Sequence, residues 1–131
     1  MLSSRFSQGT ARIYSVNYDL PLLDWRIVNV LQWYGPMSAN AIANRIAVDK
    51  GNACRAVARL EHRRLILREP DPHDQRVVNL SLTQAGERLF QEINPIARRR
   101  EKKLLSVLTE SEQLALDDML DRLLGQLDRL D

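Results

Sequence analysis

Residues 38–82 constrain the fold most, because two short helix patterns stand there in tandem, directly before a strand pattern. Ser38 and Asp49 each lie where an N-cap is expected, since their side-chain oxygens can accept hydrogen bonds from the first free amides of a helix. The first helix is predicted to end near Ile46 and the second near Arg64. Two short helices joined by a tight turn, the second more basic than the first, predict a helix-turn-helix.

Residues 65–82 contain two apolar runs on either side of a tip rich in proline and aspartate. In the second run Val78, Leu80 and Leu82 alternate with polar residues, which is the pattern of a half-buried strand. The stretch therefore predicts a β-hairpin with a polar, projecting tip. A hairpin that directly follows a helix-turn-helix is a wing.

Longer helix patterns flank this region on both sides. Residues 22–34 are apolar on more than one face, as in a buried helix, and a Gly-Pro pair ends them. Thr83 can cap a long helix over residues 84–107. A less regular pattern over residues 6–18 predicts a further helix near the N-terminus.

The last predicted helix begins with a capping box, in which Thr109 and Glu112 satisfy each other's backbone amides. Five leucines recur along it at alternating spacings of four and three residues: Leu116, Leu120, Leu123, Leu127 and Leu130. A stripe this apolar exceeds what a small domain readily covers, which favours a partner subunit. Packing within its own chain is the alternative.

The formal net charge of +2 hides a strong segregation of charge along the chain. Residues 45–108 carry 14 basic and 8 acidic side chains, which gives +6, whereas residues 109–131 carry 2 basic and 7 acidic, which gives −5. The basic middle is a candidate surface for a polyanion, and the acidic end suggests a different partner. Solvated helix faces are the alternative explanation for such charge blocks.

Length and composition exclude several classes of protein. A chain of 131 residues fits one domain of roughly 100–200 residues, and its single Cys54 cannot form an internal disulfide. Neither a membrane-length apolar run nor a secretory signal is present, so we expect a soluble, cytoplasmic protein without a membrane partner. With only two histidines, no Gly-rich phosphate loop and no nucleophile motif, we expect no metal site, no cofactor and no enzymatic activity.

Motifs spread over residues 20–125 match one family pattern. They are LPLLDWRIV at 20–28, GPMS at 35–38, DKGNACRAVARLE at 49–61, DQR at 74–76 followed by VNLSLT and Gly86, and LTESE at 108–112. Together they resemble the MarR family of bacterial transcriptional regulators, whose wing carries a D-x-R…L-T-x-x-G pattern.

The resemblance implies a mainly α fold with a small β-hairpin wing, that is, a winged helix-turn-helix with dimerisation helices at both ends. Residues 1–19 would be the N-terminal dimerisation helix and residues 20–86 the DNA-binding region. Residues 87–131 would form the long helix and the C-terminal dimerisation helix of a single intertwined domain. The family further implies a homodimer that binds palindromic double-stranded DNA as a repressor and is released by a small aromatic or phenolic effector.

The outward face of the second helix carries the candidate groups for reading DNA. A rotation of about 100° per residue that turns Ala53, Ala56, Val57 and Leu60 inward turns Gly51, Asn52, Arg55, Ala58 and Arg59 outward. Asn52 and Arg55 are expected to read bases in the major groove, because Asn pairs with an adenine edge and Arg with a guanine edge. Lys50 and Arg59 are expected to contact phosphates, and Gly51 lets the backbone approach the duplex. Solvated side chains on an exposed helix are the alternative.

The predicted wing tip offers a second contact with DNA. Arg76 suits a narrow minor groove, where the negative potential is strongest. Asp74 has the wrong charge for DNA and is expected to hold the wing by accepting hydrogen bonds, while His73 and Gln75 lie in the same tip. Ser38, at a helix N-terminus, is expected to contact a phosphate, with helix capping as the alternative.

An effector pocket is expected between the dimerisation helices and the winged region. The large side chains predicted near that junction are Tyr14, Tyr18, Trp25, Trp33 and Met37, and plain core packing is the alternative for each of them.

Two alternatives to a DNA-binding regulator controlled by an effector stay open at this level. The same helices can form a winged-helix module that binds another protein and never binds DNA. A thiol-based regulator can also act through Cys54, whose thiolate would be favoured by the nearby Lys50 and Arg55.

Overall fold

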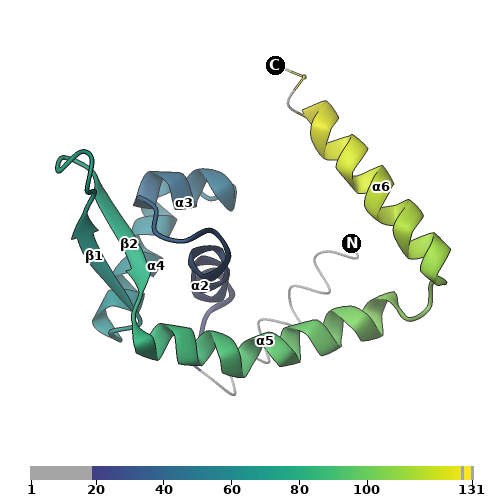
Figure 1. The fold of residues 1–131 in the computed structure, drawn as a ribbon, viewed down its shortest axis with the longest axis horizontal. Coiled ribbons are helices and arrows are strands. Elements are labelled where there is room, and N and C mark those ends of the chain that lie inside the picture. Colours follow the sequence, from purple (N-terminus) through teal and green to yellow (C-terminus); the bar gives the residue numbers. More distant parts are fainter. Residues whose placement is uncertain (1–18, 128, 131) are drawn as a thin grey trace. The chain divides into compact units, whose positions relative to one another are not determined.

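The computed structural model describes residues 19–127, 129 and 130. The helix predicted over residues 6–18 lies outside the described residues. Two compact units meet between Asn94 and Pro95. The described elements in chain order are α2 (Leu22–Tyr34), α3 (Ala39–Arg45), α4 (Lys50–His62), β1 (Ile66–Pro70), β2 (Val78–Leu82), α5 (Gln84–Leu105) and α6 (Glu110–Leu127), as Figure 1 shows.

Helices α3 and α4 form the predicted helix-turn-helix. The Ser38 hydroxyl accepts a hydrogen bond from the Ala41 amide at 3.1 Å, and an Asp49 carboxylate oxygen accepts one from the Asn52 amide at 3.0 Å. Both N-caps are therefore as predicted. Between the helices the chain turns at Ala47, whose φ of 55° is left-handed. The Ala47 and Val48 amides donate to the Asn44 and Ala43 carbonyls at the end of α3, and Asp49 caps α4, so local hydrogen bonds are made on both sides of this short turn.

The core of the first unit lies between α2, α3, α4 and the hairpin. Helix α4 contributes the predicted inward stripe of Ala53, Ala56, Val57 and Leu60, all four fully buried. The other helices contribute Trp25, Ile27, Val28 and Leu31 from α2, Ile42 and Ala43 from α3, and Phe90 and Ile93 from α5. Burial of these side chains on one face of α4 leaves the opposite face exposed.

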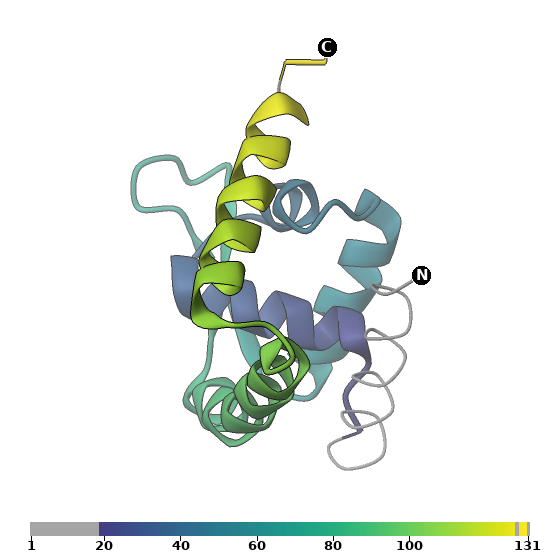
Figure 2. The same ribbon diagram turned by 90° about the vertical axis from the view of Figure 1, so that its right-hand side faces the viewer.

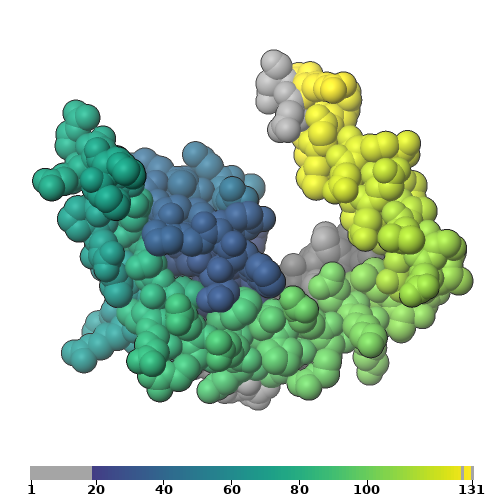
Figure 3. All heavy atoms as spheres, viewed as in Figure 1, coloured from purple at the N-terminus to yellow at the C-terminus, as the bar shows by residue number. Residues whose placement is uncertain are grey.

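Strands β1 and β2 pair antiparallel, from Ile66 opposite Leu82 to Pro70 opposite Val78. Leu80 is buried, and its backbone exchanges two hydrogen bonds with that of Met37, at 2.8 and 3.2 Å. The hairpin is therefore tied to the segment that precedes α3, while its tip protrudes beside the helices (Figure 3). The fold class predicted from the sequence, mainly α with a β-hairpin wing, is confirmed.

A close backbone approach joins the base of the hairpin to α5. The Thr83 hydroxyl donates to the Arg64 carbonyl at 2.7 Å and accepts from the Gly86 amide at 3.1 Å. A Cβ atom on Gly86 would lie only 2.2 Å from the Leu65 carbonyl oxygen. Position 86 therefore requires glycine, which gives a physical reason for the L-T-x-x-G motif.

The second unit begins at Pro95 and contains the last part of α5 and the whole of α6. The predicted capping box is present: Glu112 accepts from the Thr109 amide at 2.9 Å, and Thr109 accepts from the Glu112 amide at 3.2 Å. Figure 2 shows that α6 is continuous along its length. No described residue of α6 is buried.

Candidate nucleic-acid interface

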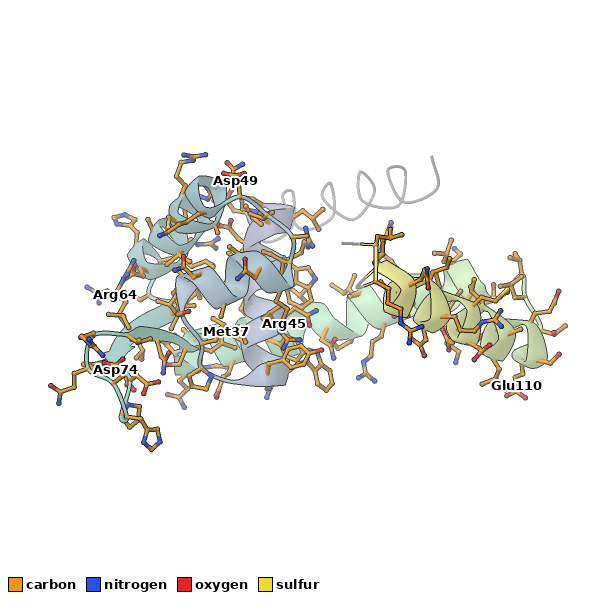
Figure 4. The ribbon with its side chains drawn as sticks, turned by 90° about the horizontal axis from the view of Figure 1, so that it is seen from above. Met37, Arg45, Asp49, Arg64, Asp74 and Glu110 are labelled. Carbon is orange, nitrogen blue, oxygen red and sulfur yellow. The ribbon has the colours of Figure 1, made fainter. Side chains whose placement is uncertain are left out.

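Helix α4 presents the outward face that the sequence predicts. Gly51, Asn52, Arg55, Ala58 and Arg59 are all exposed, on the side opposite the buried stripe. Figure 4 labels Asp49 at the start of this helix and Asp74 in the hairpin tip. The orientation of this face is confirmed, and its contacts with DNA remain a prediction.

Three polar residues on the first turns of α4 are hydrogen-bonded in series. The Asp49 carboxylate accepts from the Asn52 side-chain amide at 2.5 Å, and the Asn52 carbonyl oxygen accepts from the Arg55 guanidinium at 2.5 Å. The hydrogen bond from the Asn52 backbone amide holds the pKa of Asp49 below its usual value, with smaller contributions that include the charge of Arg55. Asp49 therefore stays ionised and orders the two side chains expected to read bases.

The Arg59 side chain forms an ion pair with another residue of the first unit. Its guanidinium donates to both carboxylate oxygens of Asp24 on α2, at 2.6 and 3.2 Å. The Asp24 side chain is only 1% exposed, whereas that of Arg59 is 46% exposed. Because this ion pair joins α2 to α4, Arg59 helps to orient α4 within the unit, and its contact with a phosphate remains a prediction.

Sequence reasoning missed Asp24 as a structural residue. Its signal was a lone carboxylate inside the apolar run LLDWRIV, since a buried charge requires a partner. Nothing local identifies that partner, because Arg59 lies 35 residues further along the chain.

Other arginines of the first unit also make internal contacts. Arg26 donates to the Ile46 carbonyl at 2.7 Å, Arg68 pairs with Glu61 at 2.7 Å, and the Arg45 guanidinium lies 3.8 Å from the centre of the Tyr34 ring. Part of the positive charge counted in the sequence is therefore engaged in contacts within the unit, although an exposed pair such as Arg68 and Glu61 adds little to stability. Among the described residues no ion pair involves Lys50, which is exposed at the start of α4.

The wing tip is organised by Asp71, a residue that sequence reasoning did not single out. One of its carboxylate oxygens accepts from the amides of His73 and Asp74 at 2.8 and 3.1 Å, and the other from the Asn79 side chain at 2.8 Å. The His73 amide contributes most to a pKa of Asp71 below its usual value. An aspartate before a proline in a turn was the available signal, because it readily accepts from amides that follow it.

Asp74 accepts from both the backbone amide and the guanidinium of Arg76, each at 3.1 Å, as expected for a residue that holds the wing. The Arg76 side chain is 92% exposed, and His73 and Gln75 are exposed beside it. The tip therefore presents a cation to solvent, and its insertion into a minor groove remains a prediction.

The residues expected to line an effector pocket occupy different surroundings. Trp25 is buried and stacks on Phe90 with ring centres 5.6 Å apart, while Trp33, 58% exposed, meets Phe90 edge-on at 6.2 Å. Met37 is half-buried beside the hairpin. Tyr14 and Tyr18 lie outside the described residues.

Cys54 is exposed on α4. Within the described part of the chain no cluster of His, Cys, Asp or Glu side chains can hold a metal ion. No helix in the same residues has the length and hydropathy of a membrane span.

The fold and the exposed face of α4 define a winged helix-turn-helix protein. A sequence profile described as the MarR family matches residues 18–77. The transcriptional regulator FarR of Neisseria gonorrhoeae is 32% identical over 99 residues, which cover 76% of this chain and 68% of FarR. The transcriptional repressor NicR of Pseudomonas putida is 31% identical over 118 residues, which cover 88% of this chain and 75% of NicR. The chain therefore belongs to the MarR family of DNA-binding transcriptional regulators.

A solved structure extends the likeness over nearly the whole chain. The MarR/EmrR family transcriptional regulator from Acinetobacter sp. ADP1 aligns with a TM-score of 0.90 at 27% identity, covering 99% of this chain and 92% of that protein. The aligned part thus extends beyond the hairpin into α5 and α6.

Proposed function

We propose that this protein is a homodimeric, sequence-specific repressor that reads a palindromic operator with α4 and the wing. The observation that carries this proposal is the exposed face of α4, where Asn52 and Arg55 stand opposite a buried stripe. Arg76, exposed in the adjacent wing, supplies a second contact. Membership of the MarR family supports the regulatory role.

Each exposed group has a distinct part in this proposal. Arg55 pairs with a guanine edge in the major groove, and Arg76 enters the minor groove. Lys50 attracts phosphates without regard to sequence, and the amides at the start of α3, beside Ser38, contact a phosphate. On the geometry of dimeric helix-turn-helix proteins the half-sites lie about one helical turn apart.

The experiment selects bound sites from a random duplex pool and then compares Arg55→Ala with Lys50→Ala. We expect Arg55→Ala to lose about 1–3 kcal/mol of binding free energy and to relax preference at one base position, because a bidentate contact discriminates among bases. Lys50→Ala should weaken all duplexes equally and reduce the salt dependence. An equal loss on selected and random duplexes for Arg55→Ala would contradict base reading by Arg55.

We also propose that a small aromatic effector releases the protein from DNA. Family resemblance supports it, together with Trp33, a largely exposed aromatic residue at the end of α2. Small aromatic acids added to the preformed DNA complex should release the duplex, and Trp33→Ala should raise the concentration required. Release by aliphatic acids at the same concentrations would contradict aromatic recognition.

The same binding assay separates the alternatives. DNA binding should weaken steeply between low and moderate salt through counterion release, whereas a module that only binds proteins would show no duplex binding at any salt concentration. A thiol sensor predicts that peroxide releases DNA from the natural chain and not from Cys54→Ser. A response that survives the substitution would exclude Cys54 as the sensor.

A further inference from the structure

We propose that Asn52 is a positioning residue, oriented by Asp49, that sets the Arg55 guanidinium for a single base position. This inference rests on the proposed function. It replaces the expectation that Asn52 itself pairs with an adenine edge. Its foundation is the series of hydrogen bonds from Asp49 through Asn52 to Arg55.

The Asp49 carboxylate fixes which way the Asn52 amide faces. One carboxylate oxygen accepts from the Asn52 backbone amide at 3.0 Å and the other from its side-chain amide at 2.5 Å. An ionised carboxylate only accepts hydrogen bonds, so it must be met by the nitrogen end of the Asn52 side chain. The oxygen end is thereby turned toward Arg55.

That oxygen determines where the guanidinium lies. One terminal nitrogen of Arg55 donates to it at 2.5 Å. A Cβ atom on Gly51 would lie 3.5 and 3.8 Å from the two terminal nitrogens of Arg55, so the guanidinium lies over this glycine. A guanidinium has five N–H donors, and the hydrogen bond to Asn52 leaves others for the two acceptors of a guanine edge.

Both ends of the Asn52 amide are thus engaged within the helix, and its effect on recognition passes through Arg55. Asp49 has two opposing effects on binding. Its charge repels every phosphate, whatever the sequence, while its hydrogen bonds orient the group that discriminates among bases. Loss of the carboxylate should therefore strengthen binding to random DNA and weaken discrimination at one position.

The test uses the full chain and the duplex selected above, with every base pair substituted in turn. Asp49→Ser keeps an N-cap, since Ser38 caps α3 in this same chain. We expect Asp49→Ser, Asn52→Ala and Arg55→Ala to lose discrimination at the same base position, by about tenfold for Arg55→Ala. Asp49→Ser should also bind random duplex more tightly than the natural chain does.

A double-variant cycle separates positioning from reading. If Asn52 acts through Arg55, then Asn52→Ala combined with Arg55→Ala loses no more than Arg55→Ala alone. Glu61→Gln is the matched control, because Glu61 is another carboxylate on α4 paired with an arginine, Arg68, and its loss should leave base preference unchanged.

Two results would overturn the inference. The first is that Asn52→Ala loses discrimination at a base position other than the one affected by Arg55→Ala, or that the losses from these two substitutions add. The other is full discrimination by Asp49→Ser. Failure of the proposed function is distinguishable, because the natural chain would then select no sequence from the random pool. If Asp49→Ser does not fold, the cycle between Asn52 and Arg55 still decides the question.

Discussion

The two units of this protein bury their apolar residues to very different degrees. In the first unit, side chains such as Ile27, Val57 and Leu80 are at most 1% exposed. In the second, Leu120, Leu123, Leu127 and Leu130 on the predicted stripe are 46–68% exposed, and Leu116 is intermediate. The winged unit therefore contains its own core, whereas this chain alone leaves the leucine face of α6 largely in solvent. This difference supports the proposal that the winged unit binds DNA and that a second subunit covers the leucine face of α6.

Charged residues on the leucine face of α6 should have the largest effect, because that face is what distinguishes the second unit from the first. We expect Leu123→Glu combined with Leu127→Glu to abolish the proposed dimer, because two leucines no longer buried in each subunit remove about 3–6 kcal/mol per subunit. Sedimentation should show a monomer. Gly125→Glu is the control and should leave the dimer intact, because position 125 is turned by about 200° around α6 from both leucines. A dimer that survives the double substitution would place the interface elsewhere.

Removing the partner of Asp24 should have the next largest effect, and only on the winged unit. We expect Arg59→Met to lower the free energy of unfolding by about 3 kcal/mol, because a carboxylate that is 1% exposed then lacks its counter-ion. Denaturant unfolding at matched protein concentration measures this change. Asp24→Leu combined with Arg59→Met should recover most of the lost stability. Unchanged stability of Arg59→Met would show that the ion pair does not hold α2 against α4.

Two helical glycines, one in each unit, have different surroundings. Gly86→Ala should destabilise the protein by about 1–3 kcal/mol, because the new Cβ meets the Leu65 carbonyl at 2.2 Å and the hairpin or α5 must shift. Gly125→Ala has open space and should stabilise α6 by up to about 1 kcal/mol. Thermal unfolding of both variants measures the contrast. Equal changes in unfolding temperature would show that both positions accommodate an added Cβ atom equally well.

A fall in pH should have the smallest effect on stability, and it should affect both units. The pKa values of Asp49, Asp71 and Glu112 are lowered, in each case chiefly by a backbone amide that donates to the carboxylate. A lowered pKa stabilises the fold above the usual values of 3.8 for Asp and 4.5 for Glu, and this stabilisation is lost as pH falls through the folded-state values. Unfolding midpoints over a pH series should therefore fall gradually in acid. Glu112→Gln should reduce that slope, and an identical slope would contradict the role of the capping box.

Features fixed by short-range interactions were predictable from the sequence. The caps Ser38, Asp49, Thr83 and Thr109 are present, because each depends on an amide only three residues away. The inward and outward faces of α4 follow from helical periodicity alone. The exposure of Arg55 and Arg59 on the outward face is confirmed in this way, and their contact with DNA remains a prediction.

Contacts between residues distant in sequence were not predictable in the same way. The Asp24 and Arg59 pair spans 35 residues, and the backbone of Met37 pairs with that of Leu80 in the hairpin. Neither contact was anticipated, since one residue's chemistry does not reveal which distant residue packs against it. The hydrogen bonds of Asn52, although local, depend on a choice of rotamer that composition leaves open.

From the sequence alone it was possible to predict the order of the described elements, the starts of α3, α4, α5 and α6, the motif of the wing and the family. These depend on periodicity, capping and turn chemistry, which act over a few residues. Folding in three dimensions settles which charged side chains form ion pairs within the chain, which side chains are oriented by neighbours, and which leucines remain exposed. Those outcomes depend on packing, because only the folded chain brings together groups such as Asp24 and Arg59 and excludes water from them.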